Sequence, residues 1–258
     1  MSLTFYKYQG TGNDFVIIDN RQLVFDKNNT KLVKYLCDRR FGIGADGLIL
    51  LENDKTSDFK MVYYNADGNE STMCGNGGRC IVAFAQFLGI IEKQTTFLAI
   101  DGLHEAYIEG DVVKLKMQDV AEIKTYNNYV FLDTGSPHHV QMESDLEHLD
   151  VKVVGCEIRY GNPYNEEGAN VNFVSKISNE EFAVRTYERG VEDETLSCGT
   201  GVTAVALAMH EIGETQNTVI TLNTEGGQLQ VSFKKNDLGY HDIWLIGPAK
   251  RVFKGNLA

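Results

Sequence analysis

One structural pattern occurs twice in this chain of 258 residues, and the repeat constrains the fold more than any other feature. In the first half, YYNADG precedes MCGNGGRCIVAFAQFLG, and in the second half, TYERG precedes SCGTGVTAVALAMHEIG. Cys74 and Cys198 each start a glycine-rich turn, and the apolar helical segment that follows ends at a glycine 15 positions after the cysteine. The copies are offset by 124 residues. Because a repeated pattern indicates a repeated structural unit, we expect two similar domains.

Short apolar runs in both halves predict strands around each of these helices. A hairpin pattern follows each helix, and Gly102 and Gly226 both lie 28 positions after their cysteine. One more helix is expected over residues 30–40, with a capping Thr or Asn. We expect two α+β domains that face each other across a cleft, the first spanning 1–118 with 247–258 returning to it, and the second spanning 119–246. The predicted strands are 15–19, 48–52, 59–65, 95–100, 106–109 and 112–117, then 129–133, 173–176, 182–187, 218–222, 228–233 and 243–246.

The charge balance disfavours several classes of partner. The chain has 24 basic and 36 acidic residues, a formal net charge of −12, and no stripe of Lys and Arg that could neutralise phosphates. Nucleic acid and membranes are therefore not expected as partners. No stretch reaches the roughly 18 apolar residues of a membrane span, so we expect a soluble cytoplasmic protein. The five cysteines are odd in number and irregularly spaced, which predicts reduced thiols and no metal site.

The position of the repeated cysteine suggests chemistry. A thiol just before a helix lies at the positive end of the helix dipole and near unpaired N–H groups, and both favour the thiolate. Two such cysteines at matched positions would approach one carbon from opposite sides. One could remove a proton while the other returns it on the other face, which is what inversion of a stereocentre requires. The pair would then titrate together.

The same two turns predict an anion site. Helix N-termini bind carboxylates through backbone N–H groups, here those of Gly75, Asn76, Gly199 and Thr200. Donors fixed in place before the reaction stabilise the negative charge of a carbanion beside that carboxylate. Such a site needs no cofactor for an amino-acid substrate.

Four motifs resemble the diaminopimelate epimerase family, in the same order and across nearly the whole chain. They are GTGNDF, NADG followed by CGNGGRC, SPHH, and YERG followed by CGTG. The resemblance implies a pyridoxal-independent two-base epimerase that interconverts LL- and meso-diaminopimelate in lysine and cell-wall precursor biosynthesis. It also implies two pseudo-symmetric domains, each a β-barrel-like sheet around a central helix, and a homodimer.

Site residues follow from the same resemblance. Cys74 and Cys198 match the family's base and acid, and His138 and Glu188 match residues that tune the two thiols. Arg189 would suit the distal carboxylate of the substrate, because a guanidinium binds a carboxylate with two hydrogen bonds. The chain departs from the family at Gly47 and Ser136, where many members have glutamine and asparagine. The expected substrate-binding residues are Asn13, Asn65, Gly75, Asn76, Asn172, Glu188, Arg189, Gly199 and Thr200.

Other classes of protein share parts of these patterns. GIGADG at 42–47 fits the glycine pattern of a dinucleotide site, but LILLE after it predicts a strand instead of the required helix. A proline racemase-like epimerase shares paired cysteines but not GTGNDF, NADG and YERG together. A thiol redox protein stays open as an alternative, since two facing thiols could form a disulfide, although no CxxC is present.

Overall fold

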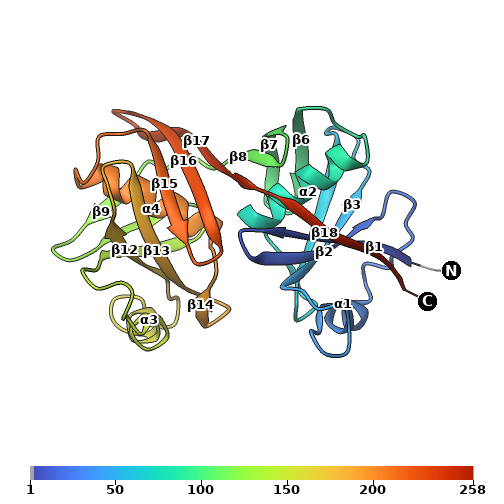
Figure 1. Cartoon of the computed structure of the whole chain (residues 1–258), viewed down its shortest axis with the longest axis horizontal. Helices are drawn as coiled ribbons and strands as arrows, with labels where there is room; N and C mark the ends of the chain where they lie inside the picture. The colour runs from blue at the N-terminus through green and yellow to red at the C-terminus, as the bar shows by residue number, and fades with distance from the viewer. Residues whose placement is uncertain (1–2, 258) are drawn as a thin grey trace. The chain divides into compact units, whose positions relative to one another are not determined.

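The computed structural model describes residues 3–257. The chain forms two compact units: unit 1 extends to Leu115 and includes the segment from Gly247 onward, and unit 2 is Lys116–Ile246. Strands dominate both units and helices are few, which confirms the predicted α+β class (Figure 1). Among the described residues, no helix is long and apolar enough to cross a membrane.

Eighteen strands and four helices make up the described chain. Unit 1 contains β1 (Leu3–Gly10), β2 (Asn13–Asp19), α1 (Thr30–Cys37), β3 (Gly47–Glu52), β4 (Phe59–Asn65), β5 (Glu70–Ser71), α2 (Gly75–Phe87), β6 (Gln94–Ala99), β7 (Gly102–Glu109), most of β8 (Val112–Lys116) and, at the end of the chain, β18 (Lys250–Leu257). Unit 2 contains β9 (Ile123–Thr125), β10 (Val130–Asp133), β11 (Pro137–Met142), α3 (Val151–Tyr160), β12 (Asn170–Lys176), β13 (Glu181–Glu188), β14 (Asp193–Thr195), α4 (Gly199–Glu211), β15 (Val219–Thr224), β16 (Gly227–Asn236) and most of β17 (Gly239–Pro248).

Strand pairing follows one scheme in both units. A hairpin opens each scheme, β1 with β2 and β10 with β11, and its second strand runs parallel to the next, β3 or β12. That strand pairs antiparallel with β4 or β13, which in turn runs parallel to β6 or β15. A further antiparallel strand follows, β7 or β16. The repeat seen around the two cysteines thus extends through the whole pairing order.

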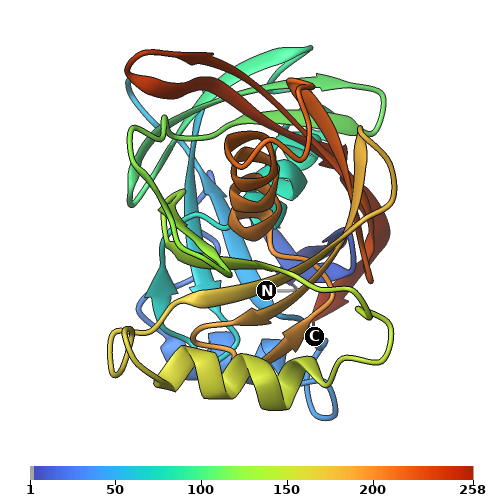
Figure 2. The same ribbon diagram turned by 90° about the vertical axis from the view of Figure 1, so that its left-hand side faces the viewer.

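The two helices that follow the cysteines are the buried ones. In α4, every residue from Gly199 to Met209 except Thr200 is buried, so this helix is enclosed on all sides. Small side chains at Ala204, Ala206 and Ala208 let the surrounding strands approach closely. Figure 2 shows α4 inside the strands of unit 2. Apolar helices of this kind, with little polar face, require a closed environment.

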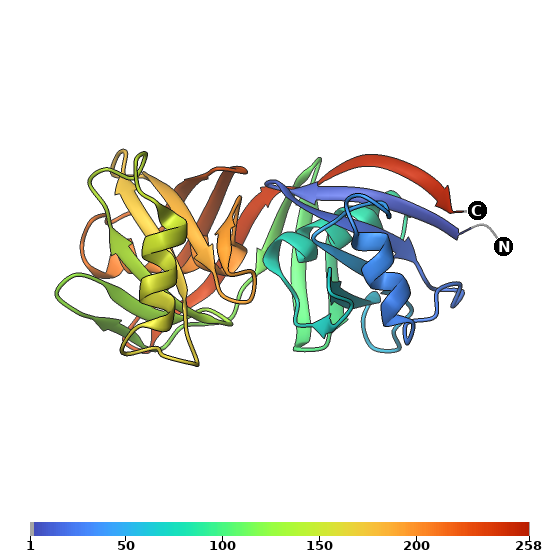
Figure 3. The same ribbon diagram turned by 90° about the horizontal axis from the view of Figure 1, so that it is seen from below.

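The other two helices are amphipathic and lie outside the strands (Figure 3). Asn29 caps α1 and Asp150 caps α3, each accepting from a backbone N–H three residues on. Val33 and Leu36 join a core cluster with β2 and β3, and Val151 joins one with β12 and β13. Since α1 connects β2 to β3 and α3 connects β11 to β12, these helices are equivalent members of the repeat.

Several sequence expectations were wrong in detail. The helix α3 is absent from the prediction, and so are the strands β1, β5, β9, β11, β14 and β18. The helix expected over 30–40 ends at Cys37, because the Asp38 carboxylate accepts from the N–H groups of Arg40 and Phe41 and forms a turn. Gly102 is matched by Gly227 and not by Gly226: both have positive φ, 128° and 132°, and both open a strand. The segment between α4 and β15 is one residue longer than the segment between α2 and β6.

Candidate active site

Cys74 is the residue that immediately precedes α2 in unit 1. Its backbone is extended, with φ −94° and ψ 135°, and its side chain makes no capping bond to the helix. The half-buried thiol therefore stays available for chemistry at the helix N-terminus. The next N–H groups, of Gly75 and Asn76, belong to the first turn, where an α-helix supplies no partners of its own. This is the predicted position.

Asn13 places an acceptor beside the Cys74 thiol. Its amide nitrogen Nδ2 donates to Oδ2 of Asp46 at 2.6 Å, so its Oδ1 must point the other way. Oδ1 lies 3.6 Å from Cys74 Sγ and accepts from the thiol. Asp46 is in turn held by an ion pair with Arg39 at 2.7 Å. The carboxylate thus orients an amide that favours the protonated form of Cys74.

Arg79 is a fully buried cation on α2, one turn after Cys74. It donates to Asn76 Oδ1 at 2.9 Å, to Thr11 Oγ1 at 3.0 Å and to the Gly75 carbonyl at 3.2 Å. Burial lowers the pKa of Arg79 to about 10, with a smaller opposing effect from Cys80 and Cys74, so the group is still charged at neutral pH. Its charge stabilises a thiolate at Cys74, which means that both protonation states of this cysteine have support.

Cys198 precedes α4 in unit 2 in the same way. Its backbone is also extended, with φ −116° and ψ 115°, and the side chain does not cap the helix. The thiol is more enclosed than Cys74, at 7% exposure. Thr200 Oγ1 lies 3.4 Å from Cys198 Sγ. Gly201 packs so tightly that a Cβ there would lie 2.5 Å from Asn172 Oδ1 and 3.3 Å from Sγ.

His138 lies on β11 and is fully buried. Burial, together with the charge of Arg189, lowers the pKa of His138 to about 3, so the ring is neutral at physiological pH. Asn172 Nδ2 lies 3.1 Å from His138 Nδ1 and also donates to the carbonyl of His139. The other ring nitrogen, Nε2, lies 3.0 Å from Ser136 Oγ. His139, by contrast, stacks on Tyr129 on the outer side of the strand.

The remaining predicted site residues differ in their surroundings. Glu188 ends β13 and accepts from Thr195 Oγ1 at 3.0 Å. Arg189 is exposed and its Nη1 donates to the Glu167 carbonyl at 2.8 Å. Asn65 is exposed at the end of β4. Asn172 is completely buried, with both ends of its amide bonded to protein groups, since Oδ1 accepts from Thr186 Oγ1.

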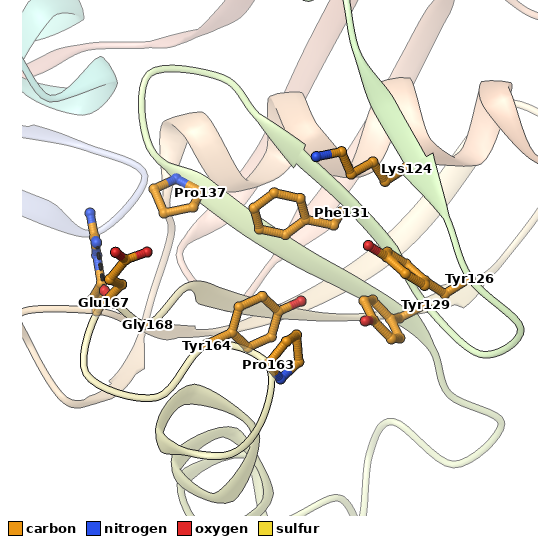
Figure 4. Close-up of a pocket in the computed structure, with 10 residues that line it drawn as sticks. Lys124, Tyr126, Tyr129, Phe131, Pro137, Pro163, Tyr164, Glu167 and Gly168 are labelled. Carbon is orange, nitrogen blue, oxygen red and sulfur yellow. Dashed lines mark hydrogen bonds between the residues drawn. The ribbon is translucent and has the colours of Figure 1, made fainter.

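A cavity of about 460 Å³ lies on the outer side of unit 2, lined by aromatic rings of β10, of the turn between β9 and β10 and of the loop after α3. Figure 4 shows Phe131 and Tyr164 on its walls, with Pro137 at one end. Arg189 also lines it. Successive residues of a strand point to opposite faces, so Pro137 faces this cavity while His138 faces the interior. The cavity is therefore on the other side of β11 from the His138 ring.

Comparison with known proteins agrees with these motifs. The family model described as diaminopimelate epimerase matches residues 5–121 and 130–252. A diaminopimelate epimerase of Flavobacterium psychrophilum is 61% identical over 250 residues, covering 96% of this chain and 98% of that protein. One from Chlorobaculum tepidum is 43% identical, with the same coverage of 96% and 98%.

The chain belongs to the diaminopimelate epimerase family. The resemblance seen in the four sequence motifs is thereby confirmed.

More distant proteins share the fold of this diaminopimelate epimerase family member. A Bacillus anthracis phenazine biosynthesis protein of the PhzF family superposes with a TM-score of 0.79 at 12% identity, covering 100% of this chain and 99% of that one. A hydroxyproline epimerase from Agrobacterium vitis gives 0.69 at 14% identity, covering 100% and 92%. The chain thus has the fold of that wider group, and the pattern GIGADG precedes the strand β3, as LILLE indicated.

Sequence reasoning missed several residues around the two cysteines of this epimerase. Arg79 stands five positions after Cys74, within the quoted CGNGGRC, but its complete burial could not be read from a polar residue type. Asp46 lies within GIGADG, but that pattern does not indicate its contact with Asn13. Asn170 was passed over for Asn172, although the period of two in a strand places both on one face. Ser136 was noted only as a lost amide.

Proposed function

We propose that this protein interconverts LL- and meso-diaminopimelate, with Cys74 and Cys198 as its two proton-transfer groups and without a cofactor. The observation that carries the proposal is the matched pair of cysteines, each at the N-terminus of a buried helix, in a chain that belongs to the diaminopimelate epimerase family. Removal of an α-proton from one face and its return on the other needs two such groups. The product would serve lysine and cell-wall precursor synthesis.

Hydrogen bonding supports distinct starting roles for the thiols. The Cys74 thiol donates to Asn13 Oδ1 and is therefore held as the acid. Cys198 is then the base: its thiolate takes the α-proton, and the electron pair of the C–H bond passes to the α-carbon and its carboxylate. Cys74 gives its proton to the opposite face and becomes the thiolate, which the buried Arg79 stabilises. The reverse reaction starts from this second state.

The substrate carboxylate next to the reacting carbon would bind at the helix N-termini. Backbone N–H groups of Gly75, Asn76, Gly199 and Thr200 belong to the first turns of α2 and α4. Their donors are fixed by the helices before the reaction begins, so they stabilise the developing negative charge without reorganisation. We propose Arg189, exposed and positively charged, for the distal carboxylate.

Asn13, Asn65 and Glu188 are proposed as further groups that bind the substrate or tune the site. Asn172 is better suited to holding His138 than to touching substrate, because its amide is enclosed and bonded at both ends. We assign Asn172 this supporting role.

We also propose that the protein is a cytoplasmic homodimer. Strand β18 pairs with β1 and presents Val252 and Phe253, which are 57% and 46% exposed. Apolar side chains on a strand edge are a common association surface. Light scattering tests the proposed dimer with the wild type and Val252→Lys, and Leu238→Lys serves as the exposed control. A monomeric wild type contradicts the proposal.

Proton NMR in heavy water tests the reaction itself. The reduced protein should remove the α-proton signal of LL-diaminopimelate and form the meso isomer, and Cys74→Ala and Cys198→Ala should each abolish both changes. Proline serves as the control substrate. Exchange with proline but not with diaminopimelate would contradict the proposed substrate, and no exchange with either would contradict the proposed reaction.

A further inference from the structure

We propose that Ser136 is a positioning residue that directs the hydroxyl proton of Thr200 at Cys198 Sγ and so holds Cys198 as a thiolate in the resting protein. Its catalytic consequence rests on the proposed function, but the state of the thiol does not. A chain of hydrogen bonds in unit 2 runs from Asn172 through His138, Ser136 and Thr200 to Cys198, and the direction of each bond decides the state of the thiol.

Two backbone groups set the direction of this chain. The carbonyl of His139 can only accept, so the Asn172 atom 3.0 Å from it is the amide nitrogen. That nitrogen also donates to Nδ1 of His138. A neutral imidazole carries one proton, and with Nδ1 accepting, the proton is on Nε2. His138 therefore donates to Ser136 Oγ, across 3.0 Å.

A second fixed amide points at the same serine. The N–H of Arg189 can only donate, so the Asn170 atom 2.9 Å from it is Oδ1, and the Nδ2 of Asn170 faces Ser136 Oγ at 3.1 Å. The oxygen of Ser136 thus accepts two hydrogen bonds, one from His138 and one from Asn170. A hydroxyl oxygen has two lone pairs, so the remaining role of Ser136 is to donate.

The Ser136 hydroxyl lies 3.3 Å from the Thr200 hydroxyl oxygen, which can accept its proton. In the proposed arrangement, the Thr200 hydroxyl accepts this bond and donates its own proton to Cys198 Sγ, 3.4 Å away. Hydrogen bonds to a charged acceptor favour the charged form, so this arrangement favours the thiolate. The equivalent position in unit 1, two residues after Cys74, is Asn76, which has no hydroxyl and is bonded to Arg79.

The other ionisable groups of unit 2 near this chain do not replace it. His138 stays neutral across the range in which a thiol titrates, because burial lowers its pKa to about 3. Glu188 at the end of β13 is a negative group and would oppose a thiolate, while Arg189 beside it is positive. These two charges are adjacent in the chain and of opposite sign, whereas the Thr200 hydroxyl lies within hydrogen-bond distance of Cys198 Sγ, at 3.4 Å.

Alkylation with iodoacetamide from pH 5 to 10, followed peptide by peptide with mass spectrometry, tests the proposal without substrate. In Ser136→Ala, the apparent pKa of Cys198 should rise and its alkylation at neutral pH should slow about tenfold, while Cys74 is unchanged. Ser136→Thr, which keeps the hydroxyl, should behave like the wild type. Ser136→Cys, close in size but a weak donor, should show the same loss as Ser136→Ala and covers the case in which the alanine variant does not fold.

A chain of hydrogen bonds that acts in series also predicts how two substitutions combine. Thr200→Val removes the last donor and should slow Cys198 alkylation at least as much, and the double variant with Ser136→Ala should be no slower than Thr200→Val alone. Thr134→Val is the matched control, because the Thr134 hydroxyl bonds the carbonyl of Thr200 and not its hydroxyl. An unchanged rate of Cys198 alkylation in Ser136→Ala, or additive decreases in that rate in the double variant, would overturn the proposal. A wild-type protein that shows the expected alkylation pattern but no epimerisation of diaminopimelate would instead count against the proposed function.

Discussion

Asn172 donates to Nδ1 of His138 across 3.1 Å, and this contact decides which nitrogen of the imidazole carries the proton. The same amide is fixed by the His139 carbonyl, so the ring cannot change tautomer without breaking a buried hydrogen bond. The histidine is therefore a neutral donor toward Ser136 and not a cation beside Cys198. Its influence on the thiol passes through hydroxyl groups.

Stability should fall on acidification because His138 is buried as a neutral ring. Its pKa is about 3 in the folded protein against 6.5 in the unfolded chain, so the unfolded state binds an extra proton between these values. The stabilising contribution is complete above pH 6.5 and decreases by roughly 1.4 kcal/mol per pH unit down to about pH 3.

Urea unfolding at pH 7, 6 and 5 measures this slope. His138→Gln removes one of two buried neutral rings and should reduce the slope, the remainder coming from His139, whose pKa burial lowers to about 4. His148→Gln, at an exposed histidine, should leave the slope unchanged. Equal slopes in the wild type and His138→Gln would show that the ring is already protonated or accessible.

Arg79 should matter for both stability and the Cys74 thiol. Arg79→Met removes a buried cation and the hydrogen bonds that it donates to Asn76, Thr11 and Gly75, which should cost about 3 kcal/mol of unfolding free energy. The pKa of Cys74 should rise as its positive neighbour is lost. Thermal unfolding and peptide-resolved alkylation measure the two effects, with Arg251→Met as an exposed control. A Cys74 alkylation rate that does not change would contradict the electrostatic role.

Asp46 should control the amide of Asn13. In Asp46→Ala, the bond that fixes Nδ2 is lost, so the amide can rotate and Oδ1 no longer reliably accepts from Cys74. Epimerisation should slow about tenfold in both directions, because the proton transfer at Cys74 takes part in the forward and the reverse reaction. Cys198 alkylation should stay normal. Asp19→Ala, which removes an ion pair with Arg21 at the other end of β2, should retain full activity. Full activity in Asp46→Ala would exclude this role.

Gly201 and Gly77 occupy the same position of the repeat, three residues after each cysteine, yet they should differ in tolerance. A Cβ at Gly201 meets Asn172 Oδ1 at 2.5 Å, whereas one at Gly77 meets the flexible end of Ile49 at 3.3 Å. Gly201→Ala should destabilise the protein by about 2 kcal/mol and reduce activity, and Gly77→Ala should be nearly neutral. Thermal unfolding of the two variants measures this difference in stability. The expectation fails if Gly201→Ala is the better tolerated change.

The amino-acid sequence by itself was enough for the α+β class, the family and the two helices after Cys74 and Cys198. These follow from local patterns: an apolar helical period, a glycine-rich turn and strands of alternating or continuous apolar residues. The strand over 59–65 was predicted with its observed bounds, because apolar runs and turn residues mark its ends. The same repeat contained a signal for α3, since α1 holds the equivalent place, but the two helices share no obvious sequence motif.

Only the tertiary structure decided the protonation and polarity of the site. The strand around His138 depends on pairing with β10 and β12, and its burial follows from that pairing rather than from any local period. Arg79 and Asp46 act through residues that lie 30 to 70 positions away or on other elements, such as Thr11 and Asn13. The direction of a hydrogen bond is set by partners brought together in space. A pattern of residue types along the chain records which groups can donate or accept, but the fold alone determines which of them meet.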